Sequence, residues 1–77
     1  MRRDMWAMAV IHLRRATSWL PDWIDGHLEL AVAYIRLKRY DLAAKALVEA
    51  RRISPDDPQV EEVTALLDSL RSANSLS

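Results

Sequence analysis

The sequence has no cysteine, no phenylalanine, a single glycine and no excess of charge of either sign. Without cysteine the chain has no disulfide and no thiolate metal ligand, which fits a reducing compartment. Because its 11 basic residues equal its 11 acidic ones, no net field draws nucleic acid or an anionic membrane to it. No β-branched run alternates as a strand would, so the 77 residues are predicted to form one small all-α domain.

Residues that could carry catalysis or hold a metal form no recognisable pattern. His12 and His27 are the only imidazoles and fall on different predicted helices, so both are expected to be structural. The acidic pairs at 56–57 and 61–62 flank a predicted helix start, where the helix dipole favours negative charge. No glycine-rich loop could cradle a phosphate. We therefore expect no enzymatic activity, no catalytic residue, no cofactor and no metal site.

The first residues do not have the pattern of a targeting segment. Their apolar run from Met5 to Leu13 is interrupted by His12 and closed by Arg14 and Arg15, and no small-residue cleavage site follows. The run is also too short to span a bilayer. We expect a helix here, no signal peptide or membrane insertion, and a cytoplasmic location.

The clearest positive feature is an internal repeat. Five residues return 34 positions later in the same or a similar form: Trp6, Ala9, Leu13, Ala16 and Pro21 correspond to Tyr40, Ala43, Leu47, Ala50 and Pro55. A fixed period of about this length is typical of stacked helical hairpins. Such arrays act by presenting a surface to a partner.

Between the two copies the sequence has a more specific pattern. It reads His27-x-x-Leu30-Ala31-x-x-Tyr34 and continues with Tyr40, Ala43-x-x-x-Leu47, Ala50 and Pro55. This resembles the tetratricopeptide pattern Trp-x-x-Leu-Gly-x-x-Tyr, Ala-x-x-x-Phe and Pro. His27, Ala31 and Leu47 depart from it, in place of Trp, Gly and Phe. The resemblance implies antiparallel helical hairpins stacked as a short right-handed solenoid of four helices, which acts as a protein interaction module.

Each residue of the pattern has a packing role. Small Ala31 and Ala43 would let the two helices of a hairpin approach closely, with larger side chains beside them. A second apolar stripe, at helical spacing near the end of the chain, is formed by Val60, Val63, Leu66, Leu67 and Leu70. In this last helix the polar Thr64 and Asp68 replace Leu30 and Tyr34, which predicts a solvating end cap.

We expect a single domain over 1–77, with 4–20 as the second helix of a partial repeat and 24–57 as the full repeat. Residues 58–72 form the predicted capping helix, and 73–77 a frayed tail. Asp22 or Asp25 is predicted to cap the helix that ends near Leu37, and Asp57 to cap the last helix, with Pro58 at its first position. Lys38 and Arg39 form a turn that lacks the customary glycine. Trp19 and Trp23 are predicted to pin the intervening linker, an exposed aromatic hot spot being the alternative.

The resemblance also places a ligand groove, because in this family the first helix of each hairpin lines the concave side. The residues carried over are Asp25, Leu28, Glu29, Val32, Arg36, Glu62 and Leu66, with Ile35 and Gln59 nearby. They are mainly aliphatic and acidic, whereas members that grip a partner's terminal carboxylate use Lys, Asn and Arg. An apolar or basic segment, such as an amphipathic helix, is the expected ligand. Alternatively, Leu28 and Val32 pack on a neighbouring helix and offer no site.

A second hypothesis concerns the first helix. One side of it has no partner in the predicted arrangement, and this edge consists of Met5, Trp6, Met8, Ala9 and His12. Another copy of the chain would cover it in a homo-oligomer, which makes the protein an assembly subunit, or further repeats of a longer array would do so. Alternatively, Trp6 and the methionines fold inward. The sequence leaves the partner's identity, the oligomeric state and the biological process open.

Overall fold

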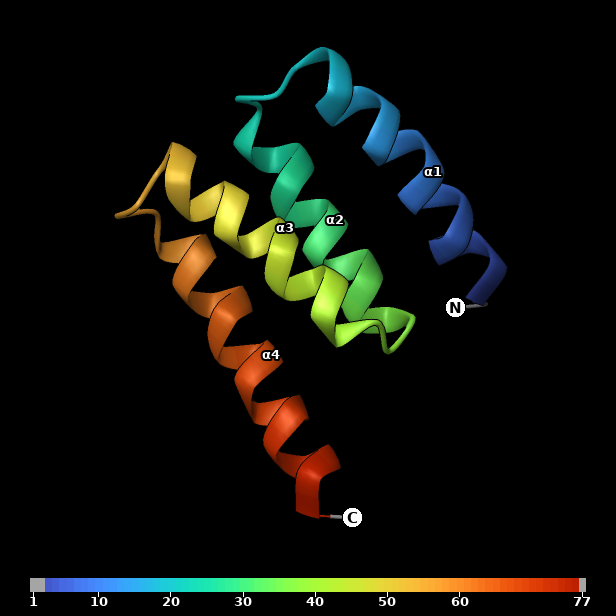
Figure 1. Cartoon of the computed structure of the whole chain (residues 1–77), viewed down its shortest axis with the longest axis vertical. Helices are drawn as coiled ribbons and strands as arrows, with labels where there is room; N and C mark the ends of the chain where they lie inside the picture. Colours follow the sequence, from blue (N-terminus) through green and yellow to red (C-terminus); the bar gives the residue numbers. More distant parts are fainter. Residues whose placement is uncertain (1–2, 77) are drawn as a thin grey trace.

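The computed structural model describes residues 3–76 and contains four α-helices joined by short turns (Figure 1). They are α1 (Arg3–Trp19), α2 (Ile24–Arg36), α3 (Tyr40–Ile53) and α4 (Pro58–Leu76). Over the described residues there is no strand, so the predicted all-α fold of four helices is confirmed. Within the same range, no helix combines the length and apolar character needed to cross a membrane.

The helix α2 is the centre of the arrangement. It packs against α1, α3 and α4, while α3 also packs against α4. Among the described helices, α1 contacts α2 alone. In Figure 1, α1 and α4 accordingly lie on opposite sides of the α2–α3 pair. The chain thus forms a row of antiparallel neighbours, as expected for stacked hairpins.

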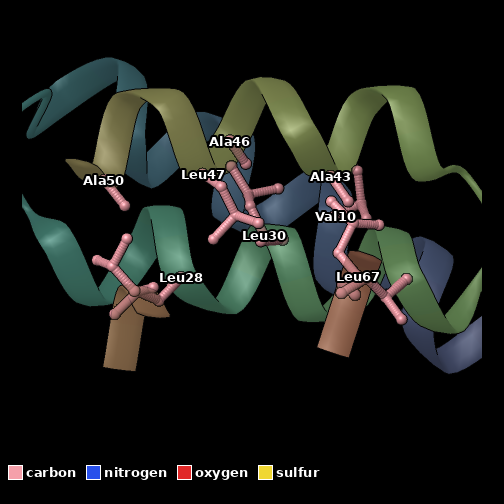
Figure 2. Close-up of a cluster of buried hydrophobic side chains, with 12 residues drawn as sticks. Val10, Leu28, Leu30, Ala43, Ala46, Leu47, Ala50 and Leu67 are labelled. Atoms are coloured by element: carbon pink, nitrogen blue, oxygen red, sulfur yellow. The ribbon is translucent and has the colours of Figure 1, made fainter. Parts of the chain in front are cut away.

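The tightest contact lies between α2 and α3 and is made largely by alanine. Ala31 of α2 and Ala43 and Ala50 of α3 are all 0% exposed. Figure 2 shows Ala43 and Leu47 pointing from α3 toward α2, beside Leu30. Side chains without bulk let two helix backbones approach closely, and the neighbouring leucines then fill the remaining space. The predicted role of Ala31 and Ala43 is therefore confirmed.

The last helix is attached through its apolar stripe. Val60 is 0% and Leu67 2% exposed, and Val63 and Leu70 are partly buried against the same core. Leu66 is the exception, since 46% of it remains exposed. At the start of α4, Pro58 is the first helical residue and the carboxylate Oδ1 of Asp57 accepts a 2.8 Å hydrogen bond from the backbone N–H of Gln59. The predicted start of this helix is thus confirmed.

Two predicted helix ends differ from the structure. The residue before α2 is Trp23, and no side chain caps that helix, because Asp22 falls within the preceding turn and Asp25 within the first helical turn. The capping prediction for Asp22 or Asp25 is therefore wrong. The helix α4 continues to Leu76 rather than ending at residue 72, since no Gly or Pro follows to stop it. The rest of the expected frayed tail, Ser77, lies outside the described residues.

The two tryptophans of the α1–α2 linker have different environments. Trp19 is 84% exposed, so the prediction that it pins the linker is wrong. Trp23 is 37% exposed, and its ring lies against Gly26 in the first turn of α2. A Cβ added to Gly26 would lie 2.8 Å from Cζ3 of Trp23 and 2.9 Å from Cγ2 of Thr17. The single glycine therefore makes room for this indole beside α1.

The turn between α2 and α3 places a lysine in a left-handed conformation. Lys38 has φ 60°, and its N–H donates to the carbonyl of Ile35 over 3.0 Å. The N–H of Arg39 donates to the carbonyl of Tyr34 over 2.8 Å. These two bonds form the Schellman arrangement that ends many helices, normally with glycine at the left-handed residue.

Replacing Gly26 by Ala is expected to lower the free energy of unfolding by about 1 kcal/mol, because the new methyl group overpacks against Trp23. In a Trp23→Ala background the cost should shrink or reverse, since alanine favours helix over glycine by about 1 kcal/mol. Chemical denaturation followed by circular dichroism measures both. An equal cost in the two backgrounds would contradict the contact.

Replacing Lys38 by Gly is expected to stabilise the chain by about 1 kcal/mol, because glycine adopts φ 60° without the steric cost borne by a side chain. Lys45→Gly is the matched control, since Lys45 is an exposed lysine inside α3. There the same change should destabilise by about 1 kcal/mol. Thermal unfolding of both variants gives the signs, and destabilisation by Lys38→Gly would refute the expectation.

Candidate partner-binding groove

A hollow of about 650 Å³ lies between α1, α2 and α4. We call it the groove, and its lining consists of Trp6, Ala9, His12, Leu13, Leu28, Glu29, Val32, Ala33, Gln59, Glu62 and Val63. Since α2 contacts both other helices, it forms the floor, with α1 and α4 as the walls. The volume falls within the range of about 300–1,000 Å³ typical of ligand sites.

The α1 wall carries residues that the repeat places in a hairpin contact. Ala9 and Leu13 are half-buried and line the groove. Their counterparts in α3 are Ala43, 0% exposed, and Leu47, 5% exposed, both against α2. The same face of the repeat is therefore covered by a helix in α3 and open to the groove in α1.

The floor of the groove is apolar. Leu28 is 6% exposed and belongs to the buried core, so most of its surface serves packing rather than a ligand. Val32 is half-buried and gives the floor more of its accessible surface. Ile35, expected near the edge, is 6% exposed and also belongs to the core. The floor is thus firmly anchored in the fold.

The rim of the groove is acidic. Glu29 on α2 and Glu62 on α4 are exposed and both line it. Neither takes part in an ion pair within residues 3–76. Among the described residues that line the groove there is no Lys or Arg. The arrangement favours a ligand that brings positive charge.

Several predicted site residues lie elsewhere. Arg36 stands over the Trp6 ring, with Cζ 5.7 Å from the ring centroid, which is within cation–π range. Asp25 and Leu66 are exposed but do not line the groove. Of the predicted self-association edge, Trp6, Ala9 and His12 line the groove, whereas the edge's methionines do not line it: Met5 is 57% exposed and Met8 59%. The predicted groove and the predicted edge therefore overlap at this hollow, although Met5 and Met8 lie outside it.

Sequence reasoning did not assign three of the lining residues to a site: Leu13, Ala33 and Val63. A signal for Leu13 was present, because its repeat counterpart Leu47 is a hairpin-contact residue. Ala33 and Val63 carry no such signal, since both resemble ordinary core residues. Ala33 is indeed 0% exposed, and Val63 packs against the core.

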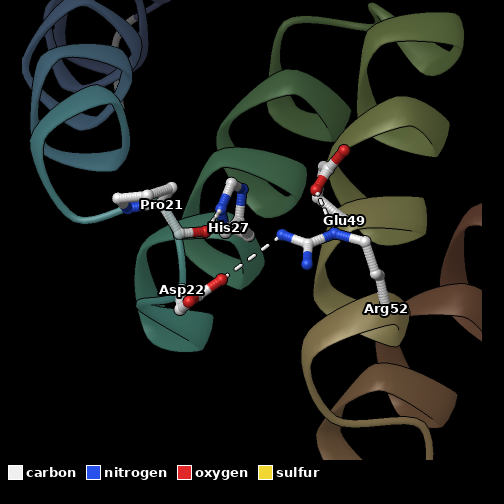
Figure 3. Close-up of polar contacts among 5 residues, drawn as sticks. All are labelled: Pro21, Asp22, His27, Glu49 and Arg52. Atoms are coloured by element: carbon white, nitrogen blue, oxygen red, sulfur yellow. Dashed lines mark hydrogen bonds and ion pairs between the residues drawn. The ribbon is translucent and has the colours of Figure 1, made fainter.

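Two sets of polar contacts outside the groove connect parts of the fold (Figure 3). His27 is 8% exposed, and its Nε2 lies 3.0 Å from the Pro21 carbonyl, so Nε2–H donates there. Arg52 bridges Glu49 at 2.9 Å and Asp22 at 3.4 Å, which ties the α1–α2 linker to α3. The hydrogen bond to Glu49, followed by that carboxylate's charge and the contact with Asp22, raises the pKa of Arg52. Over the described residues, no group of three or more His, Cys, Asp or Glu side chains could hold a metal.

Comparison with known proteins identifies one relationship. Residues 6–67 match the family model described as a tetratricopeptide repeat. The match begins at Trp6 on the groove wall and ends at Leu67 in the core of α4, so it covers parts of all four helices. No curated protein and no solved structure matches the chain.

The repeat supplies a matched pair for testing the groove wall. Ala43→Leu is expected to cost about 1–3 kcal/mol, because Ala43 is 0% exposed between α2 and α3. Ala9→Leu should change stability by less than about 0.5 kcal/mol, because its added atoms extend into the groove. Urea denaturation of the two variants gives the comparison. Similar costs at both positions would show that Ala9 does not border open space.

Proposed function

The chain belongs to the tetratricopeptide repeat family, and on this premise we propose that it binds a segment of a partner protein in the groove between α1, α2 and α4. Repeats of this family generally mediate protein–protein interactions and are typically not enzymes. The observation that carries the proposal is a hollow with an apolar floor, at Leu28 and Val32, beneath an acidic rim at Glu29 and Glu62. An apolar segment with basic residues matches both surfaces.

The composition of the rim argues against an acidic ligand. A carboxylate needs several converging donors, and the only side-chain donors among the described lining residues are Gln59, His12 and Trp6. Glu29 and Glu62 would repel an acidic tail. We therefore keep the ligand class predicted from the sequence, an apolar or basic segment, and set aside terminal carboxylate capture.

A second candidate function is self-association through the outer face of α1. It is favoured by three large apolar side chains on that helix: Met5, Met8 and Ile11 are 57%, 59% and 55% exposed. In this case the important surface is the outside of α1 and not the groove. Sedimentation at micromolar concentration distinguishes the two functions. A dimer that is lost in the Met8→Glu variant would show that the outer face of α1 mediates self-association.

Site-specific photocrosslinking in the source cell tests the groove. A benzoylphenylalanine at Val32 or Glu62 should crosslink a partner protein, because both positions line the hollow. The same group at Lys45, exposed on α3, is the control and should not capture that partner. Capture at Lys45 but not at Val32 or Glu62 would reject the groove, and capture of a second copy from Met8 would favour self-association.

A further inference from the structure

We propose that the occupant of the groove is a basic amphipathic helix of another protein, which packs on α1 as α2 packs on α3. The inference rests on the proposed function and specifies its ligand. It starts from the repeat, because α1 and α3 carry the same contact residues 34 positions apart. In α3, Ala43 and Leu47 are covered by α2. In α1, Ala9 and Leu13 line the groove, so a helix placed in it would cover them in the same way.

The internal repeat also indicates which residues this helix presents. The helix α2 directs Leu30, Ala31 and Tyr34 toward its hairpin contact, where Ala31 is 0% and Leu30 6% exposed. Its counterpart in the groove would therefore carry a large aliphatic residue followed by a small one, with an aromatic residue three positions later. The small residue would allow a close approach to Ala9, as Ala31 allows beside Ala43.

The charge of the rim selects a basic helix. Glu29 and Glu62 flank the floor from two helices, are exposed, and are not ion-paired within residues 3–76. A helix lying in the groove would bring its flanking residues close to both carboxylates. Lys or Arg there would be attracted, and Asp or Glu repelled.

A second copy of this chain is a poor occupant. Its α4 would be the helix available for the purpose, since α2 is already packed inside its own hairpin. Thirty-four positions after Leu30 and Tyr34, however, α4 has Thr64 and Asp68. Placing Asp68 against the apolar wall of α1 would bury a carboxylate without a basic partner, which is unfavourable. A second copy of this chain is therefore disfavoured as the occupant.

Fluorescence anisotropy with three labelled peptides tests the inference on the full chain. The first peptide has the α2 sequence, Ile24–Arg36, with Asp25→Lys and Glu29→Lys. The second adds Leu30→Thr and Tyr34→Asp, the residues of α4 at the matching positions, and the third is the unaltered acidic sequence. We expect the first to bind saturably and at least tenfold more tightly than either of the others. Equal binding of all three, or none by the first, overturns the inference.

Protein variants show where the peptide binds. A Glu29→Lys, Glu62→Lys double variant and, separately, Ala9→Leu should each weaken binding of the first peptide at least tenfold. Asp56→Lys is the charge control, because Asp56 is exposed and does not line the groove, and it should leave binding unchanged. If the Ala9→Leu variant binds the first peptide with unchanged affinity, the peptide displaces α2 or binds elsewhere, which contradicts the inference.

The outcomes separate this inference from the proposed function. If Val32 crosslinks a partner but the first peptide neither binds nor competes with that partner, the groove is used and the helical occupant is wrong. If the peptide binds as expected but no groove position crosslinks a partner, the groove can bind a helix and the proposed cellular function is wrong. A dimer of the unmodified chain that Ala9→Leu dissociates would make a second copy the occupant and overturn the inference.

Discussion

The close approach of α2 and α3 is the contact on which the rest of the molecule depends. Three alanines with 0% exposure, Ala31, Ala43 and Ala50, leave little side-chain bulk between the two backbones, and neighbouring leucines fill the space beside them. Because α1 and α4 are both attached to α2, the position of that helix decides how far apart the groove walls stand. The floor is therefore part of the core: Leu28, which borders the groove, is also buried in the cluster that holds the hairpin together.

The charge distribution is as important as the packing. The chain as a whole is neutral, yet the described residues that line the groove include two carboxylates and no Lys or Arg. The basic side chains that the structure pairs with acids lie on α3 and α4, where Arg51 contacts Glu61, Arg52 contacts Glu49 and Asp22, and Arg71 contacts Asp41. All of these pairs are exposed, so they contribute little to stability. These arginines neutralise carboxylates outside the groove. The negative charges of Glu29 and Glu62 are therefore left to attract a ligand.

Most of the fold could be predicted from local spacing, whereas the site could be predicted only in part. The hairpin follows from the positions of Ala31 and Ala43, and the start of α4 from Asp57 followed by Pro58, because these signals act within a few residues or at helical periods. The environment of Trp19 and the cap of α2 depended on how the linker turns, and no residue pattern specifies that turn. The groove required the relative placement of α1, α2 and α4. The family resemblance indicated Val32 and Glu62 as groove residues, but it could not show that Trp6 and His12 line the same hollow, nor that Arg36 lies over Trp6 instead.

The attachment of α1 to a single neighbouring helix has a consequence for the dynamics of the chain. A helix held on one side opens at lower free energy than one held on several, so the amide protons of α1 should exchange with solvent before those of α2 and α3. Anything that settles against its open side would add a second support and slow this exchange. A ligand in the groove would then be detected as slower amide exchange in α1. Its affinity would include the free energy needed to hold α1 in place.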